Sequence, residues 1–338
     1  MYPSSLTYSQ SFKVFRLLVL LGTILSLCVV VLGAYVRLTD AGLGCPDWPG
    51  CYGTLTVPQS EAAIAHAQTV YPDSTVVVGK AWREMAHRYL AGTLGLVVLT
   101  LFFLAWAARR EIKTSPFTST WLLLIITFQA MLGMWTVTML LKPAIVSAHL
   151  LGGMTTLALF MWLAHRHWGN YSTFVMPSGR LKVAIRFALV IIFMQIILGG
   201  WTSTNYAALA CTDFPTCHGV WVPAMDFKDA FHLVRNLGQN ANGGALSLAS
   251  LTAIQWTHRV GALVTFIYLG VLAINVFQYW QLKRLAVMLL LVLCTQVALG
   301  IANLILHLPL VLAVAHNFTA GLLVIILVTL NSKVTGSQ

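Results

Sequence analysis

The sequence predicts an all-α integral membrane protein whose eight transmembrane helices form two parallel four-helix bundles. Three observations support this prediction. Of the 338 residues, 58% are apolar and only 9% are charged, with a mean hydropathy of +0.81, whereas a soluble domain carries about 25% charged residues. The apolar residues lie in long continuous runs, and several motifs occur twice in the same order.

A membrane-spanning helix needs about 20 mainly apolar residues. Eight windows satisfy this requirement: 16–36, 86–107, 120–140, 144–164, 184–204, 257–277, 285–306 and 310–330. Continuous runs exclude a closed barrel, whose strands alternate between apolar and polar residues. The first run is long enough to span and is not followed by a small-residue cleavage site, so we expect a transmembrane helix and not a signal peptide.

The 20 basic residues outnumber the 9 acidic ones. In a soluble protein this excess would suggest nucleic-acid binding, but in a membrane protein it more often marks cytoplasmic segments. The short segments on the side of the N-terminus contain Lys13, Arg16, Arg109, Arg110, Lys113, Arg166, Arg180, Lys182, Arg186, Lys283, Arg284 and Lys333. We therefore predict that both termini are cytoplasmic and expect no nucleic-acid partner.

Two outer segments, about 37–85 and 205–256, are much longer than the other connections, and each contains the motif C-x-D-aromatic-P-x-C. Four features occur in the same order in both halves. In the first half they are Cys45 to Cys51, His87-Arg88, Gln129 to Gly133 and His149. In the second half they are Cys211 to Cys217, His258-Arg259, Gln296 to Gly300 and His316. Each half has four spans and the same polarity. We therefore predict parallel repeats over residues 1–180 and 181–338.

The four repeated histidines are predicted to lie near the outer face, with His87 and His258 at the outer ends of their helices. An ionisable group within a span is a candidate functional residue. A single such histidine most often forms a neutral hydrogen bond across helices. Two pairs on facing helices favour bis-imidazole ligation of haem iron, and zinc fits less well because no further ligands complete a tetrahedral shell in both halves.

Arg88 and Arg259 each follow a histidine by one position. Their side chains are long enough to reach a haem propionate at the rim of the site. Anchoring at the membrane interface is the alternative, and the sequence does not decide between them.

The halves differ in their ionisable residues. Glu84 precedes His87 by three positions, and its counterpart before His258 is Gln255; Arg37 and Asp40 correspond to Ser203 and Tyr206. A carboxylate beside a porphyrin could serve as a general acid or base or could stabilise positive charge. The alternative for Glu84 is a carboxylate that interacts with the helix dipole. The asymmetry suggests one reacting site and one holding site.

The loop cysteines are spaced for two local disulfides, Cys45 with Cys51 and Cys211 with Cys217, on the oxidising side of the membrane. A zinc site built from all four is the alternative, although the spacing is longer than usual. Such disulfides could brace the loops or exchange electrons. Cys28 and Cys294 lie within spans and are expected to be core thiols.

The combination of Glu84-Met-Ala-His87-Arg88, His149, Trp256-Thr-His258-Arg259, His316 and the paired loop cysteines resembles the haem A synthase family over essentially the whole chain. The resemblance implies oxidation of one methyl group of haem O to a formyl group, giving haem A for terminal oxidases. It implies a haem b cofactor at His258 and His316, and a substrate haem near His87 and His149. Glu84 is implied to be needed for activity and the first-loop cysteines to be involved in turnover.

The resemblance also implies a location in the bacterial plasma membrane, contact with membrane lipid and a haem O synthase as partner. Two other functions are compatible with four histidines. One is a two-haem cytochrome b-type electron carrier, which would not explain the difference between Glu84 and Gln255; the other is a haem transporter or assembly chaperone. The electron acceptor and a homo-oligomeric state are left open by the sequence.

Overall fold

The computed structural model describes residues 10–112, 115–168 and 178–335. Within these residues, eight helices are long and apolar enough to cross a membrane, which confirms the predicted all-α fold. They are α1 (Gln10–Leu38), α3 (Val78–Ala107), α5 (Pro116–Thr138), α6 (Pro143–Trp168), α7 (Gly179–Thr204), α9 (Leu248–Phe277), α10 (Lys283–Ile305) and α11 (Leu310–Thr335). The short helices are α2 (Glu61–Val70), α4 (Arg109–Ile112), α8 (Phe227–Ala230), η2 (Ala207–Leu209) and η3 (Trp280–Leu282).

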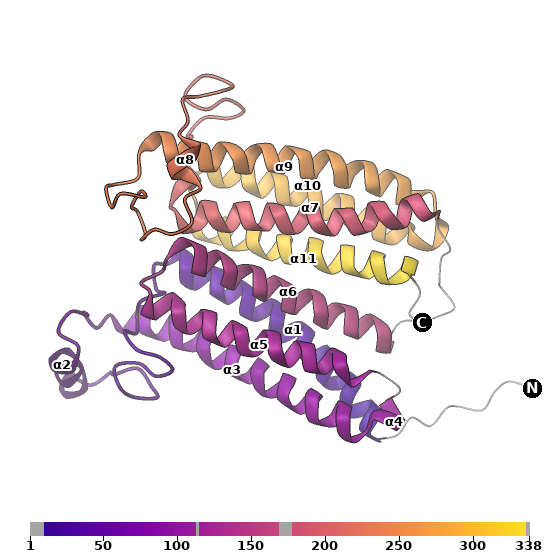
Figure 1. The fold of residues 1–338 in the computed structure, drawn as a ribbon, viewed down its shortest axis with the longest axis horizontal. Coiled ribbons are helices and arrows are strands. Elements are labelled where there is room, and N and C mark those ends of the chain that lie inside the picture. Colours follow the sequence, from indigo (N-terminus) through magenta and orange to yellow (C-terminus); the bar gives the residue numbers. More distant parts are fainter. Residues whose placement is uncertain (1–9, 113–114, 169–177, 336–338) are drawn as a thin grey trace, which may run out of the picture.

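The long helices form two groups of four that lie side by side (Figure 1). In the first group α1 contacts α3, α3 contacts α5, α5 contacts α6, and α6 contacts α1; α7, α9, α10 and α11 form the same ring in the second. Consequently α3 faces α6, and α9 faces α11, across the middle of each bundle. The bundles meet where α6 and α1 contact α11 and where α6 contacts α7.

Close packing between helices depends on small residues. Gly22 of α1 lies against the ring of Phe160, and a Cβ atom there would come within 2.0 Å of that ring. Gly321 of α11 lies between Leu27 and Leu157 of the other bundle. Because lipid is as apolar as these side chains, helices in a membrane associate through such close van der Waals contacts.

The helices α3 and α9 begin well before the predicted spans, which started at residues 86 and 257. The charged residues Lys80, Arg83 and Glu84 lower the hydropathy of the first turns of α3, but they favour a helix as well as apolar residues do. The prediction that His87 and His258 stand at helix ends is therefore wrong. Each lies more than two turns inside its helix, at roughly 3.6 residues per turn.

The long connections that carry α2 and α8 lie at one end of the bundles, and α1 begins and α11 ends at the opposite end (Figure 1). The halves were predicted to divide at residue 180, which falls in the first turn of α7. Lys113 and the connection 169–177 lie outside the described residues.

Polar contacts join the two halves near the loops. Arg37 donates a hydrogen bond of 2.7 Å to the carbonyl oxygen of Ser203, and its guanidinium lies 4.1 Å from the centre of the Tyr206 ring. The Tyr206 hydroxyl donates to Asp40 at 2.9 Å. Arg37 and Asp40 thus contact the residues that correspond to them in the other half.

Candidate functional site

His87 of α3 and His149 of α6 face each other inside the first bundle. Their ring centres are 6.4 Å apart and their planes meet at 79°. A metal ion bound by two imidazole nitrogens at roughly 2 Å from each requires ring centres about 6 Å apart. The Nδ1 atoms of both rings are buried and have no side-chain hydrogen-bond partner among the described residues, and the rings interact with the backbone of Val29 and of Gln129. The pair can therefore hold the iron of a haem between the two helices.

His258 of α9 and His316 of α11 occupy the same places in the second bundle, but both rings have hydrogen-bond partners. The amide nitrogen of Gln195 lies 3.0 Å from Nδ1 of His258 and donates to the His258 carbonyl at 3.1 Å. Nδ1 of His316 lies 3.1 Å from the carbonyl oxygen of Gln296, and Nε2 lies 3.2 Å from the Gln296 amide nitrogen.

A glycine on the preceding long helix lies against each of the four rings. A Cβ atom on these glycines would approach Cε1 of the facing histidine to 2.9 Å at Gly33 (His87), 3.4 Å at Gly133 (His149), 3.2 Å at Gly199 (His258) and 3.1 Å at Gly300 (His316). The absence of side chains lets each imidazole lie directly on a helix backbone. This recurrence supports a common role for the four rings.

Sequence comparison found only two of these glycines, Gly133 and Gly300, through the repeated Q-x-x-x-G pattern. The same spacing occurs at Gln195 and Gly199, and Gly33 is preceded at that distance by Val29. In all four cases the residue before the glycine is a leucine. A search for L-G pairs upstream of each histidine would have found all four.

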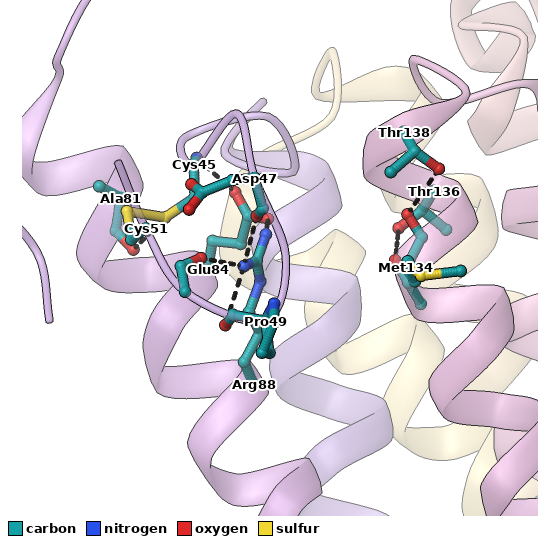
Figure 2. Close-up of polar contacts among 12 residues, drawn as sticks. Cys45, Asp47, Pro49, Cys51, Ala81, Glu84, Arg88, Met134, Thr136 and Thr138 are labelled. Carbon is teal, nitrogen blue, oxygen red and sulfur yellow. Dashed lines mark hydrogen bonds and ion pairs between the residues drawn. A yellow bond between two sulfur atoms is a disulfide. The ribbon is translucent and has the colours of Figure 1, made fainter. Parts of the chain in front are cut away.

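Glu84 is buried, with 4% of its surface exposed. One carboxylate oxygen accepts a hydrogen bond of 3.0 Å from the backbone N–H of Cys45, and the other accepts one from Arg88 (Figure 2). Gln255 takes the same position in the second half, where it accepts a 2.5 Å hydrogen bond from the N–H of Cys211 and donates one to Ala208. The loop is therefore attached in the same way in both halves, but only the first attachment carries a charge.

Arg88 and Arg259 bind the loops above their helices. Arg88 donates to the carbonyl oxygens of Asp47 and Gly50 at 2.8 and 2.5 Å, and Arg259 donates to those of Asp213, Thr216 and Cys211 at 2.8–2.9 Å. These contacts belong to neither of the two expected roles. Both arginines hold a disulfide loop one residue beyond a candidate haem ligand.

The structure contains both predicted disulfides, Cys45–Cys51 and Cys211–Cys217, and all four cysteines are buried. A zinc site built from the four loop cysteines is therefore wrong. His218 lies beside the second disulfide, but the sulfur atoms there are bonded to each other. The expectation that Cys28 and Cys294 are core thiols is also wrong, since both are free and exposed on the surfaces of their helices.

An aspartate orders each disulfide loop. Asp47 accepts hydrogen bonds from the backbone N–H groups of Tyr52 and Gly53, and Asp213 accepts them from His218 and Gly219. Asp213 also accepts one of 2.6 Å from the Thr216 hydroxyl. This hydroxyl and the two N–H groups hold the pKa of Asp213 well below its ordinary value, because they stabilise the ionised form.

Comparisons with known proteins place the chain among relatives. The sequence profile of the COX15-CtaA family, described as cytochrome oxidase assembly proteins, matches residues 16–328. A Heme A synthase of Shewanella oneidensis is 44% identical over 91% of this chain and 93% of its own length. The proteins of the same name from Caulobacter vibrioides and Halalkalibacterium halodurans are 28% and 26% identical, over 87% and 74% of this chain and 88% and 77% of theirs.

Proposed function

The chain belongs to the COX15-CtaA family of cytochrome oxidase assembly proteins, and from this membership we propose that it is an oxidoreductase that converts haem O to haem A. The reaction oxidises a porphyrin methyl group to a formyl group through successive hydroxylations and the loss of water. The relatives that carry the name Heme A synthase span nearly the same length, which supports transfer of the whole activity.

We propose that the two halves have different tasks. The first half, residues 1–180, receives haem O as substrate between His87 and His149. The second half, residues 181–338, holds haem b between His258 and His316. The supporting observations are the 6.4 Å separation of the first pair, the lack of a side-chain partner for its buried Nδ1 atoms and the glycine beside every ring. Haem b held by His258 and His316 would supply one-electron redox chemistry for the oxidation of the methyl group.

The observation that carries the proposal is the exchange of Glu84 for Gln255 at one otherwise preserved position. Both side chains accept a hydrogen bond from the N–H of the first loop cysteine. Gln255 anchors its loop cysteine without a charge, so a carboxylate is not needed for this contact, and we assign the carboxylate of Glu84 to chemistry. Glu84 is proposed as the catalytic residue of the first half.

The Glu84 carboxylate accepts hydrogen bonds from Cys45, from Arg88 and from the backbone of Gly44, whereas the two oxygens of a carboxylate can accept about four. A lone pair therefore remains available to take a proton or to face a developing positive charge. Arg88 forms an ion pair with Glu84 and holds the loop in place. We propose that Arg88 and Arg259 belong to the haem sites in this supporting sense, at the rim where haem propionates would lie.

The proposed orientation places the disulfide loops outside the bacterial plasma membrane and both termini in the cytoplasm. The support is the location of α1's start and α11's end opposite the loops, together with the excess of basic residues at that end. Haem O requires a haem O synthase as its source, and such an enzyme is the proposed partner.

The decisive experiment is chromatography of haems extracted from membranes that contain the protein and a supply of haem O. Glu84→Gln should retain haem b and form no haem A, because an amide can still accept the Cys45 hydrogen bond, as Gln255 does for Cys211. Glu61→Gln, which removes an exposed carboxylate from α2 in the connection that precedes α3, is the matched control and should form haem A. Haem A from the Glu84 variant at the wild-type level would refute the catalytic assignment. Only unmodified haem in the wild type would favour an electron carrier.

A further inference from the structure

The residue four positions before each of the four ring-contacting glycines is a glutamine in three cases and a valine in one. The three glutamines are Gln129, Gln195 and Gln296, and the valine is Val29, which precedes Gly33 and therefore belongs to His87. Each glutamine contacts its histidine. Gln129 donates to the His149 carbonyl at 2.8 Å, while Gln195 and Gln296 contact the rings themselves.

The residue three positions after each histidine is small or polar wherever a glutamine is present, and it lies next to that glutamine. Gly261 follows His258, and a Cβ atom there would lie 2.3 Å from the Gln195 side-chain oxygen. Gly152 follows His149, and a Cβ atom there would lie 2.2 Å from the side-chain oxygen of Gln129. Thr319 follows His316, and its hydroxyl donates a hydrogen bond to the side-chain oxygen of Gln296. Only the residue after His87, Leu90, is large and apolar. It occurs in the one case in which Val29 takes the place of the glutamine.

The two halves therefore differ in how firmly the imidazole rings are held. A glutamine side chain contacts each second-half ring, whereas among the described residues no side chain is hydrogen-bonded to Nδ1 of either first-half ring, and these two rings interact with the backbone of Val29 and of Gln129. A ligand histidine whose second nitrogen is hydrogen-bonded is fixed in orientation and is a stronger donor to the metal. When Nε2 binds a metal, Nδ1 carries the proton, so Gln195 would accept from it through Oε1, with the carboxamide turned over from the orientation in which its nitrogen lies 3.0 Å from Nδ1.

We propose that Gln195, with the space provided by Gly261, makes His258 a retaining haem ligand, whereas Val29 and Leu90 leave His87 as the exchangeable ligand at which substrate haem enters and product haem leaves. Gln195 is a positioning residue in this scheme, since it acts through His258. The inference rests on the proposed function, which requires one haem to stay bound while the other is replaced in every turnover.

The test uses purified full-length protein loaded with haem b and apomyoglobin as the haem acceptor. Gln195→Val combined with Gly261→Leu gives the second half the residues of the first. Loss of a second-shell partner typically weakens metal binding about 10- to 100-fold, so we expect haem b to transfer to apomyoglobin faster by about that factor. The midpoint potential should also rise, because a weaker donor ligand stabilises ferric iron less.

The reciprocal variant, Val29→Gln with Leu90→Gly, changes the other half and does not depend on the folding of the first variant. It should slow the release of haem from the first-half site. Wild-type transfer rates and an unchanged potential in the Gln195 variant would overturn the inference, as would unchanged release in the reciprocal variant. Failure of the proposed function would look different, since His258→Ala would then leave haem b binding and its spectrum unaltered.

Discussion

The contact between Gly33 and the His87 ring allows a quantitative test of the substrate haem site. A Cβ atom at position 33 would lie 2.9 Å from Cε1 of His87, closer than side chains normally approach, whereas at position 133 it would lie 3.4 Å from His149, an ordinary contact distance. Both glycines are in helix interiors, where replacement by alanine favours the helix by about 1 kcal/mol. Gly133→Ala is therefore a matched control with the same gain.

Overpacking a tight contact costs about 1–3 kcal/mol. In the free protein the His87 ring can turn away from a new methyl group, but a ring bound to iron cannot. The cost therefore falls on the haem-bound state, where it corresponds to binding weakened about 5- to 140-fold. Gly33→Ala should show this loss when haem O is titrated into protein that already holds haem b, and Gly133→Ala should bind nearly as the wild type does. Equal losses in the two variants, or wild-type binding by Gly33→Ala, would refute the assignment of His87 as a ligand held against α1.

Three further predictions concern the parts around the haem sites. Arg37→Ala removes the hydrogen bond to Ser203 and the stacking on Tyr206, so thermal unfolding in detergent should show that the free energy of unfolding falls by about 1–3 kcal/mol. The control is Arg83→Ala, which removes a guanidinium 5.7 Å from the Tyr35 ring and should lower the free energy of unfolding less. A membrane-permeant maleimide should label Cys28 and Cys294 in the folded protein, and mass spectrometry should find the four loop cysteines labelled only after unfolding and reduction; labelling of the loop cysteines without a reductant would contradict the disulfides. Because the pKa of Asp213 is lowered by its hydrogen bonds, its contribution is present above the ordinary carboxyl pKa and is lost only as the pH falls through the lowered value. Amide hydrogen exchange in this loop should therefore stay protected below about pH 4, where an ordinary aspartate takes up a proton. Loss of protection at about pH 4 would contradict the lowered pKa.

The number and type of the helices could be predicted from the sequence because each span is a continuous apolar run of sufficient length. The starts of α3 and α9 could not be predicted in this way. Hydropathy identifies the part of a helix that contacts lipid, and the first turns of α3 contain Lys80, Arg83 and Glu84. Helix formation continues through such residues, since their backbone hydrogen bonds are made within the helix in water as in lipid.

The site was predictable where one side chain and its spacing were sufficient, as for the four histidines and the cysteine pairs. The partners of Arg88 and Arg259 were not, because they are loop carbonyl oxygens whose positions depend on how each loop folds back over its helix. The role of Gln195 was missed for another reason. The Q-x-x-x-G spacing of Gln195 and Gly199 is present in the sequence, but the corresponding residue of the first half is Val29, so this pattern does not repeat between the halves. It repeats instead between pairs of helices that each surround one histidine.

The contacts of Arg37 with Ser203 and of Asp40 with Tyr206 have a consequence for the origin of the two halves. Residues that correspond to each other by repeat lie together only on the axis that relates the halves. In a symmetric dimer of two identical halves, such a residue would face its own copy. Two copies of the first half would thus bring two Arg37–Asp40 ion pairs together and would lack the Ser203 carbonyl and the Tyr206 ring that these residues contact. The present pairing of a cation with an aromatic ring requires two unlike halves.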